Sequence, residues 1–241
     1  MISLESVSCR FGDKIVLENI SCTIASHLSI LGANGAGKST LAKLICNLVE
    51  YDGSVRVNRK NIGEYSLKER AQLLSYIPAK LEVYDSFISL EAFVLLGRFS
   101  YKKSLFDYSS SDKKIAAECL EFLNISHLSS HPVSSLSSGE TQLALIAQAL
   151  SQQSKIIIFD EPTANLDPKN SKIIAQHIKG LKEYHQVILI THDIALAAFI
   201  NSPVAFIKNK KVHFYEQEFF KKETLESLYE VDFEKYGVKF D

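Results

Sequence analysis

Short apolar runs rich in β-branched residues alternate along this chain with longer stretches in which apolar positions recur at helical spacing. Residues 2–7 alternate between apolar and polar side chains and residues 14–25 are rich in β-branched residues, so both are predicted strands. A third strand, at 28–31, runs into a glycine-rich loop and a helical stretch at 40–49. The other predicted strands cover residues 54–57, 73–77, 156–159, 187–190 and 204–208.

Helices are predicted between most of these strands. Short, fully apolar strands that alternate with helices are typical of a parallel sheet covered on both faces, which indicates the α/β class. Asp167 followed by Pro168 marks one helix start, because it places a capping side chain before a proline. The predicted helices cover about 67–72, 89–97, 112–123, 140–152, 168–184 and 193–200.

The middle of the chain shows a different pattern, in which helical segments are joined by polar, serine-rich connections without a strand. We interpret about 80–138 as a helical subdomain inserted into the α/β core of a single domain. That core comprises about 1–79 and 139–213. Residues 214–241 form a charged and aromatic C-terminal appendage, with a helix predicted near 217–230.

Composition and charge exclude several classes of protein. The 27 Lys and Arg against 28 Asp and Glu give a net charge of −1, so no nucleic-acid partner is expected from overall charge. The apolar stretches, such as 143–150, are far shorter than the roughly 18 residues of a membrane span, and the N-terminus lacks a signal-peptide pattern. The four cysteines are scattered without a CxxC pair, so we interpret them as small hydrophobic residues. We expect a soluble, cytoplasmic protein.

The segment GANGAGKST at 32–40 contains the pattern G-x4-G-K-[ST] between an apolar strand and a helix. Its glycines let consecutive backbone N–H groups point at phosphate oxygens, and the helix N-terminus adds favourable potential. Lys38 is predicted to reach the β- and γ-phosphates, and the Ser39 hydroxyl to coordinate Mg²⁺. The predicted nucleotide-binding residues of this loop are Gly32, Asn34, Gly35, Ala36, Gly37, Lys38, Ser39 and Thr40.

An apolar strand, IIIFDE at 156–161, ends in two adjacent carboxylates. Asp160 is predicted to hold Mg²⁺ through water, and Glu161 to orient or deprotonate the attacking water. His192 directly follows another apolar strand, where it can contact the γ-phosphate or that water. Lys38, Glu161 and His192 are therefore the candidate catalytic residues.

Two further motifs, LSSGE at 136–140 and ANLD at 164–167, make the pattern specific. Together with the phosphate loop, IIIFDEP and THD, their order and spacing resemble the nucleotide-binding subunits of ABC transporters. The resemblance runs from about residue 2 to the C-terminal appendage. It implies the ABC ATPase fold: a P-loop NTPase core with a mostly parallel sheet, an antiparallel β subdomain at the N-terminus and an inserted α-helical subdomain.

The resemblance also implies that two copies of the chain enclose ATP at two composite sites. Ser137 and Gly139 would contact the γ-phosphate bound to the other copy, and Asp167 would lie across the dimer interface. Phe11 matches the aromatic residue that stacks on adenine, although a core phenylalanine in a strand is the other interpretation. The residues implied to act in trans are Ser137, Ser138, Gly139, Glu140 and Asp167.

Two positions depart from the family pattern. After the strand at 73–77 the family has a proline and then a glutamine that contacts Mg²⁺ and senses the membrane partner, but here Ala79 follows Pro78. Gln72 lies too early to replace that glutamine. Ser138 stands where the signature usually has its first glycine. Because an alanine methyl cannot bind metal or water, hydrolysis is expected to be present but slow.

For the activity, the resemblance implies an ATPase with ATP and Mg²⁺ as cofactors. It would act at the cytoplasmic face of the cell membrane, with integral membrane permease subunits and a separate substrate-binding protein. The segment LLGRFSY at 95–101, with Gly97 and Arg98, is similar to importers of iron–siderophore complexes, haem and cobalamin. An iron–siderophore or a related metal chelate is therefore the expected cargo.

The membrane partner is expected at a groove around Ala79 to Leu96. The residues expected in its apolar wall are Phe87, Ile88, Phe93, Val94 and Leu95. Two other functions stay open. One is a soluble ABC ATPase without a membrane partner, which the absence of a tandem second cassette disfavours, and the other is a hydrolysis-impaired ATP switch marked by Ala79.

Overall fold

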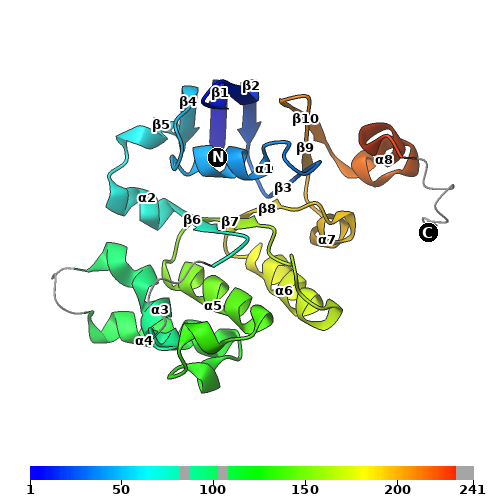
Figure 1. Cartoon of the computed structure of the whole chain (residues 1–241). Helices are drawn as coiled ribbons and strands as arrows, with labels where there is room; N and C mark the ends of the chain where they lie inside the picture. Colours follow the sequence, from blue (N-terminus) through cyan, green and yellow to red (C-terminus); the bar gives the residue numbers. More distant parts are fainter. Residues whose placement is uncertain (82–86, 103–107, 232–241) are drawn as a thin grey trace.

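Two β-sheets and a layer of helices make up the computed structural model, which describes residues 1–81, 87–102 and 108–231 (Figure 1). In the larger sheet, every neighbouring pair of strands is parallel except the first pair. Its order among the described residues is β10 (Lys211–Tyr215), β9 (Val204–Lys208), β3 (Leu28–Gly32), β8 (Gln186–Ile190), β7 (Ile156–Asp160) and β6 (Leu74–Ile77).

The smaller sheet is antiparallel and lies above the larger one in Figure 1. Together with α1 (Lys38–Ile45) it covers one face of the larger sheet, and the three share one hydrophobic core. Its strand order is β2 (Lys14–Ile24), β1 (Ile2–Phe11), β4 (Asp52–Val57) and β5 (Lys60–Asn61).

Alternate residues of the central strands face two different cores. On β7, Ile156 and Ile158 belong to the core shared with the smaller sheet, whereas Ile157 and Phe159 belong to the core beneath the helices. All five residues of β7 are buried, which explains why the strand is apolar at every position before Asp160. The predicted fold class is confirmed: a mostly parallel α/β core, an N-terminal antiparallel sheet and an inserted helical part.

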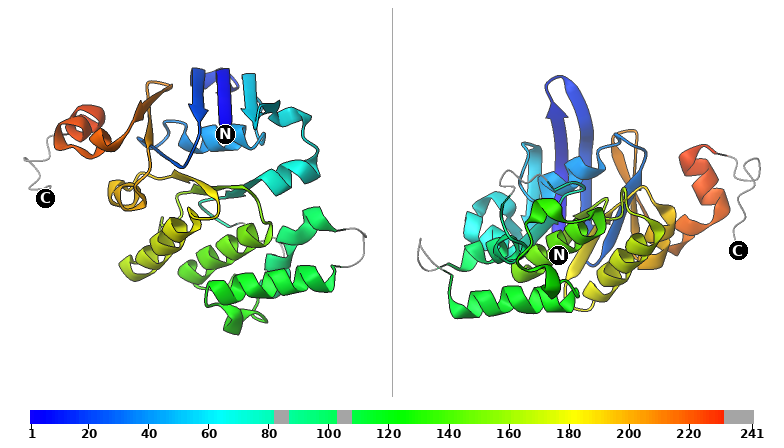
Figure 2. Two further views of the ribbon diagram at one scale, coloured as in Figure 1. Left: turned by 180° about the vertical axis from the view of Figure 1, so that it is seen from behind. Right: turned by 60° about the horizontal axis from the view of Figure 1, so that its bottom comes forward.

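Helices cover the other face of the larger sheet, and the two views of Figure 2 show them as one layer. Two parts of the predicted helical subdomain, residues 82–86 and 103–107, lie outside the described residues. No strand occurs between β6 and β7 in the described part of the chain. Apart from α1 and the C-terminal α8 (Lys222–Tyr229), the α-helices of the described residues are α2 (Leu67–Leu73), α3 (Leu90–Leu95), α4 (Ser110–Phe122), α5 (Ser138–Ser151), α6 (Pro168–Leu181) and α7 (Ile194–Ile200); Leu73 of α2 packs in the core shared with the smaller sheet.

The predicted apolar wall for a membrane partner is wrong for Phe93 and Val94. Phe93 and Val94 are buried in the core of the helical layer, and Ile88 and Leu95 pack against that core. Phe87 is exposed. The helix α3 therefore directs its apolar face inward, as an amphipathic helix in a small helical layer must.

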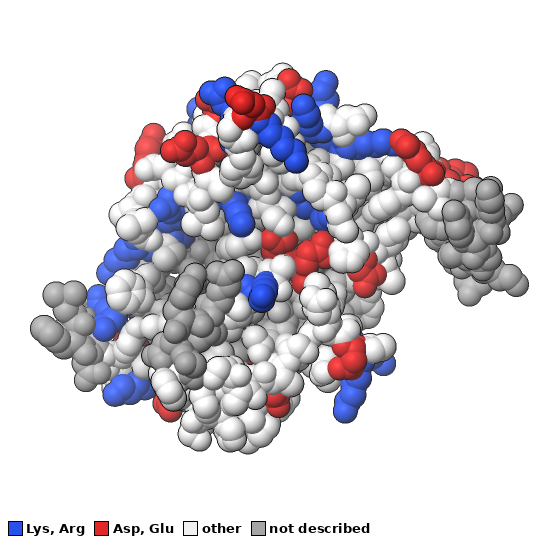
Figure 3. All heavy atoms as spheres, in the orientation of Figure 1, with Lys and Arg blue, Asp and Glu red and all other residues white. Residues whose placement is uncertain are grey.

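An exposed apolar groove lies instead between α2 and the 3₁₀ turn that follows α3 (Leu96–Tyr101). Leu67, Leu96 and Phe99 line the groove and are exposed. Lys68 and Lys102 add positive charge to its lining. Basic side chains are visible along this flank of the molecule, at the left of Figure 3.

A buried ionic network joins the 3₁₀ turn after α3 to α4 and to the end of α5. Arg98 is 4% exposed, and its Nε donates to Asp112 Oδ1 at 2.9 Å. Its Nη1 donates to the Ser151 carbonyl at 2.7 Å and to Gln153 Oε1 at 2.8 Å. Hydrogen bonds from Ser109 and from Arg98 lower the pKa of Asp112, so this carboxylate stays ionised beside the guanidinium.

The two edges of the larger sheet differ. At β6, Gln152 Nε2 from the end of α5 donates to the Leu74 carbonyl at 2.9 Å and to the Ala71 carbonyl. The other edge is β10, a strand that the sequence analysis does not predict because its exposed and half-buried residues give no apolar run. This strand crosses residue 213, where the core was predicted to end.

The C-terminal appendage closes the β10 side with aromatic contacts. In place of the single helix predicted near 217–230, the chain forms a 3₁₀ turn (Gln217–Phe220) and then α8 (Lys222–Tyr229). Phe219 of the turn points inward and packs on Phe206, with ring centroids 5.9 Å apart. Lys208 Nζ donates to the Leu228 carbonyl at 3.1 Å at the end of α8. Residues 232–241 of this predicted appendage lie outside the described residues.

None of the helices in the described ranges is long and apolar enough to cross a membrane. The four cysteines are free. Cys9 and Cys46 are buried, and burial raises the pKa of the Cys46 thiol to about 12. These thiols therefore remain protonated near neutral pH.

We expect Gly97→Ala to destabilise the chain, because a Cβ there would lie 2.1 Å from Ser151 Oγ and 2.3 Å from the Gln148 carbonyl oxygen. Overpacking of this kind costs about 1–3 kcal/mol in the free energy of unfolding, measured by urea denaturation. Gly180→Ala is the matched control, since Gly180 lies in α6 with nothing within 4 Å of its Cβ position. The control should gain up to about 1 kcal/mol from helix propensity. Equal midpoints for Gly97→Ala and the wild type would contradict this packing.

Candidate functional site

The phosphate loop connects the buried strand β3 to α1 beneath the smaller sheet. Gly37 caps α1 with a φ of 104°, in the left-handed region that side chains rarely adopt. A Cβ at this position would also lie 2.9 Å from Val16 Cγ1 on β2. The conformation of the loop therefore depends on Gly37, which fits between β2 and α1.

A hollow of about 320 Å³ opens beside this loop. Lys38 is 7% exposed there, and its Nζ donates to the Gly32 carbonyl at 2.9 Å and to the Ala33 carbonyl at 3.2 Å. The same nitrogen lies 3.8 Å from Glu161 Oε1. The hollow is lined by Val16, Asn34, Gly35, Gly37, Lys38, Ser39, Thr40 and Glu161.

Asp160 ends β7 and is 3% exposed. The Ser39 hydroxyl donates to its Oδ1 at 2.9 Å, and the Tyr76 hydroxyl donates to its Oδ2 at 2.6 Å. Hydroxyl and carboxylate oxygens are the ligands that Mg²⁺ prefers, so Ser39 and Asp160 fit the expected metal. Across the described residues, no group of three or more His, Cys, Asp and Glu side chains offers another metal site.

Tyr76 is a residue that the sequence analysis missed. Burial raises the pKa of its hydroxyl, and the hydrogen bond and charge of Asp160 raise it further, so the hydroxyl is a stable donor. The available signal was a phenol within the apolar strand 73–77, which needs a polar partner when buried.

Glu161 and His192 meet at the ends of neighbouring strands. Glu161 has a positive φ of 50°, and its backbone N–H donates to the Ile190 carbonyl of β8. Its Oε2 lies 2.8 Å from His192 Nδ1 and accepts the His192 backbone N–H at 3.3 Å. The His192 side chain is 56% exposed and Glu161 is 17% exposed, so this pair lies at the mouth of the hollow. The structure thus brings together all three predicted catalytic residues, since Lys38 contacts Glu161 on its other oxygen.

The signature residues form a helix N-terminus that does not line this hollow. Ser137 caps α5: its hydroxyl accepts the Glu140 N–H at 3.4 Å and donates to Glu140 Oε2 at 2.7 Å. The hydrogen bonds that the Ser137 hydroxyl and backbone N–H donate to this carboxylate lower the pKa of Glu140. Ser137 and Ser138 are exposed, whereas Gly139 is buried.

Gly139 is buried because α6 begins beside it. A Cβ on Gly139 would lie 2.7 Å from the Asn170 Cγ atom. Asn170 Nδ2 in turn donates to Asp167 Oδ2 at 2.5 Å, and Asp167 Oδ1 caps α6 by accepting the backbone N–H groups of Lys169 and Asn170. The structure therefore joins the signature and Asp167 within one chain, a contact that the sequence did not predict.

Three other positions considered in the sequence analysis, Phe11, Ala79 and Gln72, do not line the hollow at the phosphate loop. Phe11 is 53% exposed at the end of β1, so it is not a core residue. Ala79 is exposed just after β6. Gln72 lies on α2, and its Nε2 donates to the Ser100 carbonyl at 3.4 Å. Gln72 therefore does not substitute for the glutamine that is missing at position 79.

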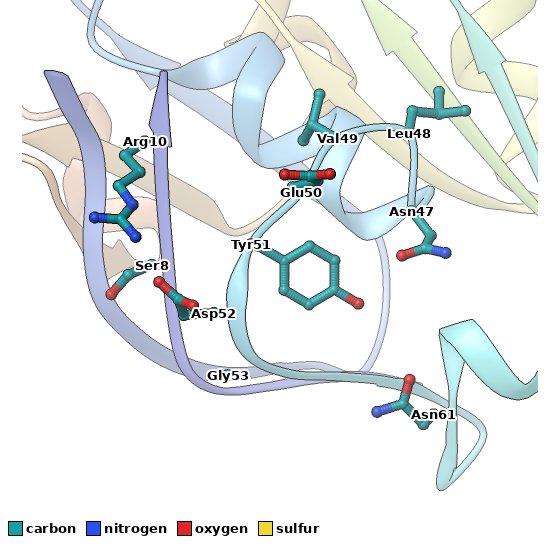
Figure 4. A pocket seen from close by; sticks show the side chains of 10 residues that line it. All are labelled: Ser8, Arg10, Asn47, Leu48, Val49, Glu50, Tyr51, Asp52, Gly53 and Asn61. Carbon is teal, nitrogen blue, oxygen red and sulfur yellow. The ribbon is translucent and has the colours of Figure 1, made fainter. Parts of the chain in front are cut away.

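A second hollow, of about 800 Å³, lies against the smaller sheet (Figure 4). Ser8 and Arg10 of β1 face Tyr51 and Asp52, where the chain enters β4. It shares no residue with the hollow at the phosphate loop. None of the predicted site residues lines it.

Comparison with known proteins agrees with the motifs. The family model for the ABC transporter matches residues 17–164, more than half of the chain. The petrobactin import ATP-binding protein YclP of Bacillus subtilis is 28% identical, with 100% of both chains covered.

Two solved structures are similar throughout. One, an inward-facing transporter assigned to the metal-chelate type of ABC transporters, has a TM-score of 0.83 at 26% identity and covers 95% of this chain and 89% of its own. The other is the dimeric structure of the bacterial ABC transporter cassette MJ0796. It has a TM-score of 0.77 at 28% identity, with 90% of this chain and 98% of that chain covered.

We expect Gly139→Ala to destabilise the contact between α5 and α6 by about 1–3 kcal/mol, because the new methyl group would overlap the Asn170 side chain. Adding Asn170→Ala should restore most of this loss, since it removes the overlapping atoms. Urea denaturation of the two single variants and the double variant gives the coupling energy. Additive losses in the double variant would contradict the contact.

Proposed function

The chain belongs to the ABC transporter family as an ATP-binding subunit, and from this premise we propose that it hydrolyses ATP to power a membrane importer. One observation carries the proposal: the phosphate loop, Asp160, Glu161 and His192 converge at one hollow, although they are far apart in the sequence. This constellation suits phosphoryl transfer to water, in which positioning and charge stabilisation provide most of the catalysis.

Each residue has a role that follows from its contacts. The amide end of α1 and Lys38 bind the phosphates, because they supply N–H groups and a cation at the hollow. Ser39 and Asp160 would hold Mg²⁺, which neutralises charge on the phosphates when it is bound. Glu161 accepts a proton from the attacking water or orients it, and His192 holds Glu161 in place through the 2.8 Å contact.

Two copies of the chain would complete each site. Ser137 and Ser138 are exposed at the N-terminus of α5, which suits contact with an anion on another molecule. Gly139, Glu140 and Asp167 would belong to the same interface in trans. The dimeric cassette that this chain resembles supports this arrangement. The exposed Phe11 ring would stack on adenine.

The groove between α2 and the turn after α3 would receive the membrane partner. Its exposed Leu67, Leu96 and Phe99 form an apolar surface, and Lys68 and Lys102 favour an acidic residue on the segment that docks there. The partner would be an integral membrane permease, so the chain would act on the cytoplasmic face of the membrane. A separate substrate-binding protein would deliver the cargo.

For the cargo we propose an iron–siderophore or a related metal chelate. The petrobactin import relative and the neighbour of metal-chelate type support this choice. The residues of this chain do not contact cargo in this proposal, because the permease and binding protein select it.

The first test is an affinity pull-down of the tagged chain from native membranes solubilised in mild detergent. A polytopic membrane protein should be retained in stoichiometric amount. Leu67→Asp should reduce its recovery, because it places a charge in the groove, whereas Leu48→Asp, at an exposed leucine of the other hollow, should not. Recovery of soluble, ribosomal or DNA-associated partners alone would refute the importer.

A second function, an ATP switch with impaired hydrolysis, is favoured by one observation: Ala79, at the position where the family has a glutamine, has no polar group for metal or water. We expect steady-state ATPase turnover of the wild type to be slow but at least about 100-fold above Glu161→Gln, the variant without the water-orienting carboxylate. Ala79→Gln should raise turnover above that of the wild type. Equal rates for the wild type and Glu161→Gln would support the switch. An unchanged rate for Ala79→Gln would contradict the role given to this loop.

A further inference from the structure

Tyr76 reaches Asp160 because of the register between β6 and β7. Tyr76 pairs with Ile158, and Asp160 is two residues further along β7. Residues two apart on a strand share a face, so Tyr76 and Asp160 are diagonal neighbours on one side of the sheet. A diagonal neighbour is within reach of a long aromatic side chain but not of a short one.

The contact is strong in physical terms. The oxygen–oxygen distance of 2.6 Å is typical of a hydroxyl that donates to an ionised carboxylate. Asp160 is 3% exposed, so its charge depends on such donors in place of water. Ser39 occupies Oδ1 and Tyr76 occupies Oδ2, so each carboxylate oxygen has one donor and the carboxylate plane is fixed.

Tyr76 is also alone in this role on its segment. Among the described residues of β6 and of the loop as far as residue 81, it is the one whose side chain is hydrogen-bonded to Asp160. Ala79 has no polar group, and Gln72 is directed to Ser100. The neighbouring Ser75 hydroxyl is paired with Ser154 on the opposite face.

We propose that Tyr76 is a positioning residue of the metal site, which holds the Asp160 carboxylate so that Oδ1 stays on Ser39, the other residue that would hold the cation. The inference rests on the proposed function, because it takes Asp160 and Ser39 as the residues that hold Mg²⁺. Tyr76 contacts neither nucleotide nor metal in this role. It acts through Asp160 by keeping Oδ2 hydrogen-bonded, so that the carboxylate keeps its orientation toward Ser39.

The test is the Mg²⁺ dependence of nucleotide affinity in Tyr76→Phe, which removes one oxygen and keeps the ring. Binding of a fluorescent ATP analogue to the full chain is measured in EDTA and then across a Mg²⁺ titration. The Mg²⁺ concentration for half of the affinity gain should rise about 10-fold, the lower end of the effect of losing a residue that orients a metal ligand. Affinity in EDTA should equal that of the wild type.

Tyr65→Phe is the matched control. Its hydroxyl donates to the Val57 carbonyl at 2.8 Å, so this variant loses a similar hydrogen bond away from Asp160. Its Mg²⁺ midpoint should be that of the wild type. A wild-type midpoint in Tyr76→Phe, or an equal shift in both variants, would overturn the role of Tyr76 alone. A wild type whose nucleotide affinity does not respond to Mg²⁺ would overturn the proposed function and this inference together.

Discussion

The buried Asp160 carboxylate, held by hydroxyl groups from two other elements, is the interaction on which the candidate site depends. Ser39 brings the start of α1 to it and Tyr76 brings β6, so one charge fixes the phosphate loop relative to the sheet. Removing either donor would leave a buried oxygen without a partner. Glu161 follows directly, and its positive φ places its carboxylate between Lys38 and His192. The strained residue is held by its surroundings, as functional residues in unusual conformations are.

Helix α5 connects the regions that the proposed function needs. Its N-terminus carries Ser137, and its C-terminal end is held by Arg98 through the Ser151 carbonyl. The adjoining Gln152 bonds to β6 and lines the apolar groove. Fourteen helical residues span about 21 Å, so this helix is a continuous path from the groove to the signature. A displacement at the groove would therefore be carried to the end of the helix, because helices and the cores around them are stiff.

Sequence patterns predict the parts of this structure in which local signals agree. These parts are the fully apolar strands, the glycine loop before a helix and the helix cap Asp167-Pro168. Each depends only on neighbouring residues, and the structure contains all of them. The missed features depend on register or on tertiary contact. Tyr76 reaches Asp160 only through the pairing of β6 with β7, and Gly139 meets Asn170 only once α5 and α6 lie side by side. The inward turn of Phe93 depends on helices whose packing no local pattern specifies.

The edges of the larger sheet have a consequence for assembly. At one edge Gln152 already binds the Leu74 carbonyl, and at the other the outer strand β10 carries Lys211 and is flanked by the aromatic appendage. Both devices discourage the addition of a strand from another molecule. Two copies would then not associate by extending the larger sheet. An association through side chains and helix ends can be formed and broken repeatedly, which suits the proposed cycle of ATP binding and hydrolysis, whereas a continuous intermolecular sheet would not.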